Sequence, residues 1–266
     1  MTRGKKIILW LVVLGPFIGL FSLVWLTSLG FFGALPTFDQ LENPKNNLAT
    51  EIMSEDGVVL GKYFFENRSR VSYNEIPQNL ITALIATEDV RFREHSGIDG
   101  RALLRAIFGA VTGKSSSGGA STITQQLAKM LFTEKPSSGI DRVMQKLKEW
   151  IIAAQLEKRY TKDEILAMYL NRFDWVNNAV GIKSAAGVYF NKKPFELDIV
   201  ESAMLVGMLK NSSLYNPRRR PELVLERRNV VFQQMFRNEM ISKNQLDSLT
   251  QLPLNIDYSP ESHREG

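Results

Sequence analysis

The chain contains no cysteine among its 266 residues, so neither a disulfide framework nor a thiolate metal site is available. Histidine is almost as scarce. His95 and His263 are the only two, which argues against a histidine-rich metal centre. Lys and Arg exceed Asp and Glu by 33 to 28, a net charge of +5. This mild excess suits an anionic membrane or ligand and equally an ordinary solvated surface, so charge alone selects no function.

A long uncharged stretch follows the first few residues. Residues 7–34 carry no charged side chain, and 7–26 alone supply the roughly 20 apolar residues that a membrane-spanning helix needs. A cleaved signal peptide would have an apolar region of only about 7–15 residues. Basic residues precede the stretch and acidic residues follow it (Arg3, Lys5 and Lys6; Asp39 and Glu42). We therefore predict a single-pass anchor over 7–34, with residues 1–6 in the cytoplasm and the rest outside.

The segment between the anchor and the main domain is predicted to be partly extended. Residues 35–73 begin with a juxtamembrane linker that contains Pro36 and Pro44. Asp56 and Gly57 then stand between two short apolar stretches, which is typical of a β-hairpin. A small β element packed on the domain is the simplest interpretation.

Residues 74–250 are predicted to form one mainly helical domain, because apolar residues recur at helical spacing from Pro77 onward. Thr161 and Glu164 form a capping box at the start of one helix. Residues 113–119 are almost entirely Gly and Ser, which predicts a mobile loop. Further helices are expected over residues 99–112, 120–132, 140–158, 161–171, 178–189, 196–209 and 219–239.

The first segment that could carry chemistry contains Glu88, Asp89, Phe92, His95 and Gly97. On a helix, Glu88, Phe92 and His95 would share one face. A glutamate that is partly shielded from water has a raised proton affinity, which suits a general base or acid. Without reference to any protein family, a surface glutamate beside a core phenylalanine explains this pattern better than a catalytic glutamate does.

A second segment follows the glycines of the predicted loop. Ser121 or Thr122 can cap the next helix, and Gln125 and Lys129 lie one turn apart on it, offering an amide and a cation to an anionic ligand. A capped amphipathic helix with solvated side chains is the ordinary alternative.

A third and a fourth segment are helical. In the third, Lys146, Lys148 and Glu149 form either a salt-bridged surface or a second catalytic carboxylate among phosphate-binding cations. In the fourth, over 162–171, Tyr169 belongs to a packed apolar face, for which we expect a structural role.

The order and spacing of these segments resemble the family 51 glycosyltransferases. These are the polymerase domain of class A penicillin-binding proteins and the monofunctional peptidoglycan polymerases. The resemblance runs from about Gly57 to the C-terminus, and it includes the blocks 181–190, 215–217 and 227–228. It implies a lysozyme-like helical fold, lipid II as the substrate, and a β-1,4-linked glycan formed with release of undecaprenyl pyrophosphate.

The resemblance also implies roles for individual residues. Glu88 matches the general base that deprotonates the acceptor 4-hydroxyl, and Glu149 matches the second essential glutamate. An inverting displacement of this kind needs a base for the nucleophile and cations for the leaving pyrophosphate. The residues implied to bind substrate are Asp89, Phe92, His95, Gly97, Ser121, Thr122, Gln125, Gln126, Lys129, Arg142, Lys146 and Lys148.

Three positions depart from the family pattern. Gln145 stands where the third motif usually has Arg, which leaves Arg142 as the nearest upstream arginine and puts pyrophosphate contacts from that side in doubt. Met130 replaces a common Asn, and Asn191 replaces a common Gly. None of them touches the two glutamates, so activity is still expected.

The expected setting follows from the same resemblance. The chain would lie in a bacterial inner membrane with its catalytic domain outside the cytoplasm. Its partners would be lipid II, the nascent glycan strand, the lipid bilayer, and cell-wall synthesis or division proteins, with no nucleic acid. No organic cofactor is expected, whereas a divalent cation, Mg²⁺ or Mn²⁺, could share the pyrophosphate charge.

Two other functions are weighed against polymerisation. A lytic transglycosylase or hydrolase on the same fold would need no pyrophosphate site, so Lys129 and the cations of the third segment argue against it. A silent membrane-anchored scaffold would not need both glutamates. Residues 251–266 resemble a linker toward an absent transpeptidase domain, and a naturally monofunctional polymerase is the alternative.

Overall fold

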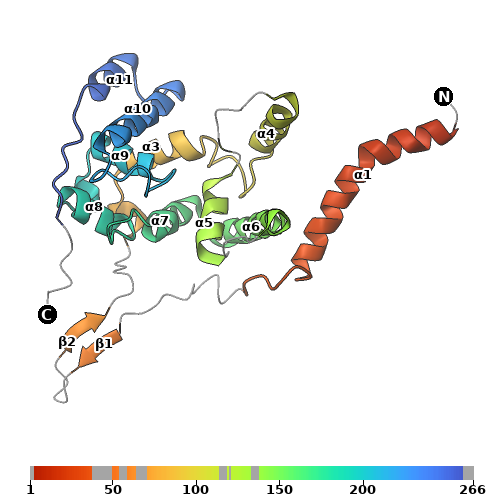
Figure 1. Ribbon diagram of the computed structural model, residues 1–266, viewed down its shortest axis with the longest axis horizontal. Coiled ribbons are helices and arrows are strands. Elements are labelled where there is room, and N and C mark those ends of the chain that lie inside the picture. Colours follow the sequence, from red (N-terminus) through yellow and green to blue (C-terminus); the bar gives the residue numbers. More distant parts are fainter. Residues whose placement is uncertain are drawn as a thin grey trace.

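The computed structural model describes residues 3–37, 50–53, 59–63, 71–113, 119, 121–132 and 138–259. Its main body is helical (Figure 1). Two short strands, β1 (Thr50–Met53) and β2 (Val59–Tyr63), pair antiparallel below this body, with Thr50 opposite Tyr63. The turn predicted at Asp56 and Gly57 lies outside the described residues, as do most of the predicted linker and most of the predicted Gly/Ser loop.

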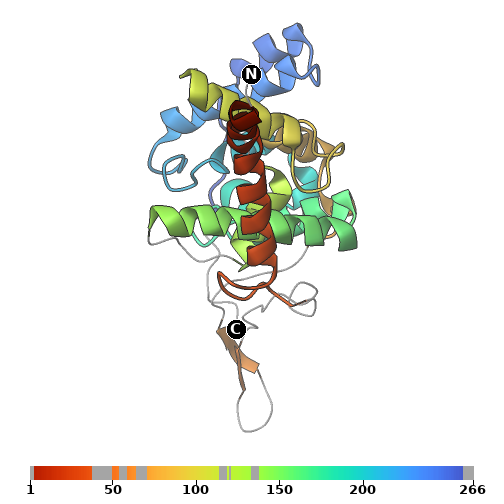
Figure 2. The same ribbon diagram turned by 90° about the vertical axis from the view of Figure 1, so that its right-hand side faces the viewer.

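The N-terminal helix α1 (Arg3–Ser28) extends away from the main body and reaches it only near its C-terminal end. Figure 2 shows α1 crossing in front of α6 (Gly139–Arg159), and the two helices are in contact. Among the residues that the structure describes, no helix combines the length and apolar character needed to cross a membrane. The membrane anchor over 7–34 therefore stays a prediction of the sequence.

The main body is built from short helices whose starts are set by capping side chains. Asp99 accepts from the Ala102 N–H at the start of α4 (Gly100–Thr112), and Ser138 accepts from the Asp141 N–H at the start of α6. The capping box predicted at Thr161 is confirmed. The remaining helices are α3 (Gln78–Glu88), α4 (Gly100–Thr112), α5 (Ile123–Phe132), α7 (Lys162–Arg172), α8 (Ile182–Phe190), α9 (Ile199–Met208), α10 (Pro221–Arg237) and α11 (Lys243–Thr250), with 3-10 turns at Tyr73–Glu75 and Pro194–Glu196.

One predicted helix begins too early. The prediction started it at residue 178, whereas α8 begins at Ile182. Three residues in a row, from Val176 to Asn178, have positive φ, which an α-helix does not accommodate. Gly181 has φ +82°, and a Cβ there would stand 2.9 Å from the Asn171 carbonyl oxygen. The residues that the prediction placed in the first turn of the helix therefore belong to the tight loop that precedes α8.

A second prediction is wrong at the first chemical segment. The helix α3 ends at Glu88, because Asp89 has φ −159° and leaves the helical region. Residues 90–98 form turns rather than a continuing helix. Glu88, Phe92 and His95 therefore do not share a helix face, and contacts from α5 and α7 position them instead.

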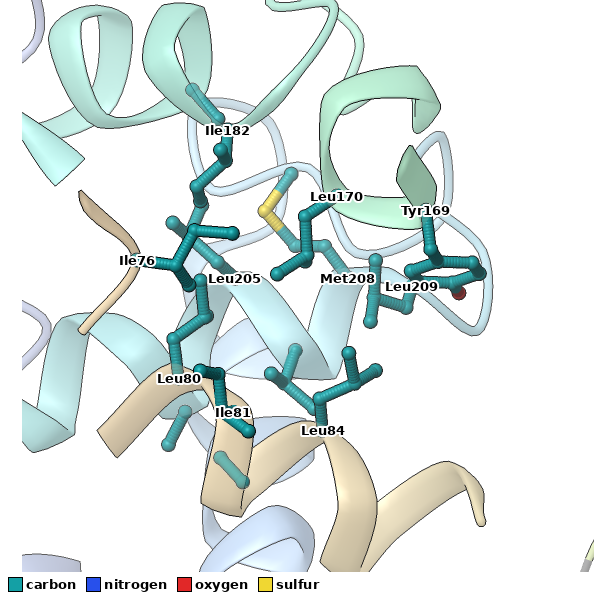
Figure 3. Packing of buried hydrophobic residues seen from close by; sticks show 14 of the residues in the cluster. Ile76, Leu80, Ile81, Leu84, Tyr169, Leu170, Ile182, Leu205, Met208 and Leu209 are labelled. Atoms are coloured by element: carbon teal, nitrogen blue, oxygen red, sulfur yellow. The ribbon is translucent and has the colours of Figure 1, made fainter. Parts of the chain in front are cut away.

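The hydrophobic core lies around α9, whose residues from Val200 to Met208 are all buried. The helix packs against α3 on one side and α10 on another. Figure 3 shows Leu80 and Leu84 of α3 meeting Leu205 and Met208 of α9. Each fully buried Leu or Met side chain contributes about 1.5–3 kcal/mol. This packing buries α3 as far as Ala86, two residues before Glu88.

The segment after α11 packs back onto the main body. The buried Arg228 of α10 donates to the Pro253 carbonyl at 2.9 Å. Further along, the Ser259 N–H donates to the Val188 carbonyl, and the guanidinium of Arg218 lies over the Tyr258 ring at 4.3 Å from its centroid. The first nine residues of the predicted linker 251–266 are thus described as part of the domain surface, and the others lie outside the described residues.

Candidate active site

Glu88 is the last residue of α3, and its carboxylate is partly exposed. Its Oε2 accepts a hydrogen bond of 2.9 Å from the Nε2 of Gln126 in α5. The oxygen of the same Gln126 amide accepts from the hydroxyl of Tyr169 in α7, also at 2.9 Å. Three helices therefore converge on this carboxylate through one bridging amide.

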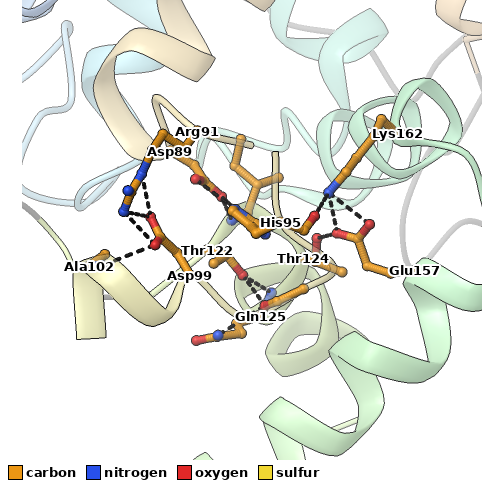
Figure 4. A network of polar contacts seen from close by, with 12 residues as sticks. Asp89, Arg91, His95, Asp99, Ala102, Thr122, Thr124, Gln125, Glu157 and Lys162 are labelled. Carbon is orange, nitrogen blue, oxygen red and sulfur yellow. Dashed lines mark hydrogen bonds and ion pairs between the residues drawn. The ribbon is translucent and has the colours of Figure 1, made fainter. Parts of the chain in front are cut away.

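Asp89 fixes the chain immediately after Glu88. Its buried carboxylate accepts from the Ile123 N–H at the start of α5, at 3.1 Å, where the partial positive charge of the helix end favours an anion. Both oxygens lie 3.0 Å from the Nε2 of His95 (Figure 4). Since Asp89 is tied to the first residue of α5, Glu88 is held beside Gln126 three residues further along that helix.

Gly97 packs the turn that follows Glu88 against α5 and α6. Its carbonyl accepts from the Thr122 hydroxyl at 2.7 Å and from the Gln125 amide at 3.0 Å. Its φ is +86°, and a Cβ would stand 2.9 Å from the backbone carbon of Ala153 in α6. Only glycine combines this conformation with so close an approach.

A partly buried ionic network supports the turn that follows Glu88. The Lys162 ammonium donates to the His95 carbonyl at 2.6 Å and to Glu157 at 2.8 Å, and it lies 4.3 Å from the centroid of the Phe92 ring. Glu157 also accepts from the hydroxyl of Thr124 (Figure 4). Lys162 therefore joins α6, α7 and the turn that follows Glu88.

The turn also carries an ion pair between Arg91 and Asp99. Burial raises the pKa of Asp99, but hydrogen bonds from the Ala102 N–H and from Arg91 outweigh it and lower the pKa below its ordinary value. Asp99 thus stays charged at neutral pH, and its carboxylate both caps α4 and pairs with Arg91 of the turn.

The second carboxylate, Glu149 of α6, is 4% exposed. One of its oxygens accepts from the Gln145 amide at 3.1 Å, and the other accepts from the Lys146 ammonium at 2.9 Å. Lys146 also donates to the Ser121 hydroxyl at 2.8 Å, just before α5. Both glutamates are therefore tied to one short segment, residues 121–126, Glu88 through a neutral amide and Glu149 through a cation.

The predicted substrate-binding residues divide into two groups. The first is built into the framework and contacts other parts of the protein, through side chains or, for Gly97, through the backbone carbonyl (Asp89, Phe92, His95, Gly97, Thr122 and Gln125). The second remains at least partly exposed (Ser121, Gln126, Lys129, Arg142, Lys146 and Lys148). The Lys148 ammonium lies 2.8 Å from where a Cβ on Gly33 would stand, beside the turn that follows α1. The second group has surface open to a ligand, the first group supports the segments that carry it, and substrate binding by either group stays a prediction.

Sequence reasoning missed several residues of this arrangement. Tyr169 was assigned to packing, Gln145 was seen only as a departure from a motif, and the Lys162–Glu157 pair was not considered. The contacts of Tyr169 and of the Lys162–Glu157 pair join separate helices, which no spacing within one helix reveals, whereas the Gln145–Glu149 contact lies within α6 at a spacing of four residues. In the part of the chain that the structure describes, no three Asp, Glu or His side chains group together as a metal site would require.

Comparison with known proteins shows which family and which relatives this chain is similar to. A family model described as Transglycosylase matches residues 56–236. Penicillin-binding protein 1A of Pseudomonas aeruginosa is 34% identical over 225 residues, covering 85% of this chain and 27% of that protein. Penicillin-binding protein 1A of Escherichia coli is 36% identical over 228 residues (85% and 26%), and that of Aquifex aeolicus is 35% identical over 255 residues (95% and 34%). The chain thus spans about a quarter to a third of the length of these relatives.

Among solved structures, the crystal structure of penicillin-binding protein 1A from Haemophilus influenzae matches 81% of this chain and 22% of that one. The sequences are 24% identical and the TM-score is 0.45.

Proposed function

This chain belongs to the transglycosylase family, and from that premise we propose that it is a peptidoglycan glycosyltransferase of the class A penicillin-binding type. It polymerises lipid II into β-1,4-linked glycan strands and releases undecaprenyl pyrophosphate. The observation that carries the proposal is the pair of glutamates bound to residues 121–126, one through an amide and the other through a cation. A displacement with a phosphate leaving group uses a base for the nucleophile and a cationic region for the leaving group, and among the described contacts Glu88 has a neutral amide as its partner while Glu149 has a cation.

In this mechanism Glu88 takes the proton of the acceptor 4-hydroxyl. The acceptor oxygen forms a bond to the anomeric carbon of the donor sugar from the face opposite the pyrophosphate. The bond from that carbon to the phosphate oxygen breaks, and the electron pair leaves with the pyrophosphate. Because the attack comes from the opposite face, an α-linked donor yields a β-linked product.

The leaving pyrophosphate is stabilised by cations on the exposed side of the framework, namely Lys129, Arg142, Lys146 and Lys148. Glu149 acts here by holding Lys146 in position. A divalent cation, Mg²⁺ or Mn²⁺, would arrive with the pyrophosphate oxygens and take one or two carboxylates at most, which is how Mg²⁺ usually binds with phosphate substrates.

The test supplies labelled lipid II and preformed glycan strands to the protein in separate reactions. We expect polymer from lipid II and no shortening of the strands. Cleavage of strands without lipid substrate would instead establish a lytic transglycosylase or hydrolase. A protein inert on both, across detergents and with Mg²⁺ or Mn²⁺ added, would favour a scaffold for cell-wall synthesis or division proteins.

We also propose that the protein works at the outer face of a bacterial inner membrane, with residues 1–6 in the cytoplasm and residues 7–34 as a single-pass anchor. Exposed apolar side chains on α4 support this proposal, because Leu104 is 69% exposed and Phe108 is 70% exposed. Such side chains bury readily at a lipid surface.

The absence of cysteine from the chain permits a clean test of this membrane contact. A polarity-sensitive dye is attached to Phe108→Cys in the full chain, and, as a control, to Phe195→Cys, which replaces another exposed phenylalanine. On reconstitution into vesicles the emission at position 108 should shift to the blue, and that at position 195 should not. Equal emission at the two positions would contradict the proposed lipid contact of α4.

A further inference from the structure

Tyr169 carries a hydroxyl group that its packing role does not explain. The residue is fully buried among apolar side chains of α7 and α9 (Figure 3). A phenylalanine would fill the same space without bringing a polar atom into the core. The hydroxyl donates to the Oε1 of Gln126 at 2.9 Å, and the Nε2 of that amide donates to Glu88 at 2.9 Å. The side chain therefore links the core to the carboxylate that we assign as the base.

The Tyr169 hydroxyl keeps its proton at every pH at which the protein works. Burial, and next the negative charge of Glu88, raise the pKa of Tyr169 well above its usual range. A protonated hydroxyl in a dry site requires an acceptor, since an unsatisfied buried donor is costly. The Gln126 oxygen is that acceptor.

The direction of this hydrogen bond fixes the direction of the next one. An amide that turns its oxygen toward Tyr169 must turn its NH₂ group toward Glu88. A donor there favours the charged carboxylate. The reversed amide would face Glu88 with an oxygen, and such contact is favourable only when the carboxyl group carries a proton. One orientation of Gln126 thus supports the base, and the other supports its inactive form.

We propose that Tyr169 is a positioning residue for the base, which acts through Gln126 by selecting the amide orientation that holds Glu88 charged and in place. This inference rests on the proposed function, because it gives Glu88 the role of base. It adds Tyr169 of α7, which is two hydrogen bonds from Glu88, to the residues on which the role of Glu88 as base depends.

Tyr169→Phe tests the proposal, because it removes only the hydroxyl. The matched control is Tyr189→Phe, since Tyr189 of α8 is equally buried and its hydroxyl donates to the Trp175 carbonyl at 2.6 Å. We expect Tyr169→Phe to lower kcat for lipid II at least about tenfold, as befits loss of support for a charged group. Its KM should change less than about twofold, and the acid limb of its pH–rate profile should move to higher pH. Tyr189→Phe should leave the profile unchanged.

A double-mutant cycle separates a path through Gln126 from a general loosening of the core. In a Gln126→Leu background, Tyr169→Phe should have little further effect on kcat. Additive losses in the double variant would overturn the proposal, and so would an unchanged pH–rate profile in Tyr169→Phe.

A direct titration of the Glu88 carboxyl group tests this inference independently of the proposed function. With ¹³C-labelled glutamate, the carboxyl signal of Glu88, assigned through its loss in Glu88→Gln, can be followed against pH without any substrate. A midpoint at higher pH in Tyr169→Phe than in the parent supports the positioning role even if the parent makes no polymer. Identical midpoints refute it even if the parent does.

Discussion

Glu88→Gln should lower the rate of glycan polymerisation by about 10²–10⁴-fold, the usual contribution of a positioned general base. The replacement keeps the size of the side chain, and its oxygen can still accept from Gln126, so the turn around Asp89 stays in place. An amide cannot take the proton of the acceptor hydroxyl. The measurement is the initial rate of polymer formation from labelled lipid II at saturating substrate.

Glu94→Gln provides the control for Glu88→Gln. Glu94 is an exposed glutamate six residues further along the same turn-forming segment. Its replacement should change the rate less than about twofold, as is usual for surface positions away from a site. If the two variants retained similar rates, the role of Glu88 as the base would be wrong.

Glu149→Gln should lower the rate by about 10²–10³-fold, the cost of removing one preorganised electrostatic contact. The Gln145 amide can still donate to the new side-chain oxygen, but the new NH₂ group would then face the Lys146 ammonium. Two donors repel, so Lys146 leaves its place beside Ser121 and no longer meets the pyrophosphate. Single-turnover rates with lipid II measure the loss in the chemical step.

The control for Glu149→Gln comes from a second Lys–Glu pair with almost the same burial. In the Lys192–Glu201 pair, the lysine is 37% exposed and the glutamate is 6% exposed, against 35% and 6% for Lys146 and Glu149. Glu201→Gln should therefore lower the Tm by a similar amount and leave the rate unchanged. Equal rate losses in the two variants would show that Glu149 matters only for stability.

The helices could be predicted from the sequence where local signals decide their ends. Apolar spacing placed α6 to within a residue at each end, and apolar spacing together with the capping box at Thr161 did the same for α7. The start of α8 could not be predicted, because positive φ values at Val176 and its neighbours come from the surrounding structure. The short α11 was missed, since a helix of two turns with one buried residue, Leu246, has little apolar pattern.

The motifs predicted which residues form the candidate site, but they did not predict which partner in the protein each of these residues contacts. The order of the motifs indicated the family, and the match to the Transglycosylase model confirms that resemblance. His95 and Gln125 are predicted to bind substrate, and the structure adds that His95 pairs with Asp89 and that Gln125 donates to the Gly97 carbonyl; their substrate contacts stay a prediction. Motif spacing shows which residues belong together. Which of them face a ligand depends on how the helices meet, and the spacing does not contain that information.

The presence of Gln145 where the family usually has Arg changes the charges around Glu149. Arg at this position would place a cation beside Glu149, whereas Gln145 donates a neutral hydrogen bond to that carboxylate. The carboxylate therefore relies on Lys146 for its positive partner. Lys146 is the cation that the described residues place against Glu149, and for this reason we expect a large effect from displacing it.

The anomeric configuration of the first linkage formed from lipid II tests the central claim most directly. NMR of the product from a short reaction, together with the amount of polyprenyl pyrophosphate released, gives the stereochemistry and the stoichiometry. We predict a β linkage and one pyrophosphate released for each linkage, as direct displacement assisted by Glu88 requires. An α linkage would mean retention through a covalent intermediate, and it would contradict the assignment of Glu88 as the base of an inverting polymerase.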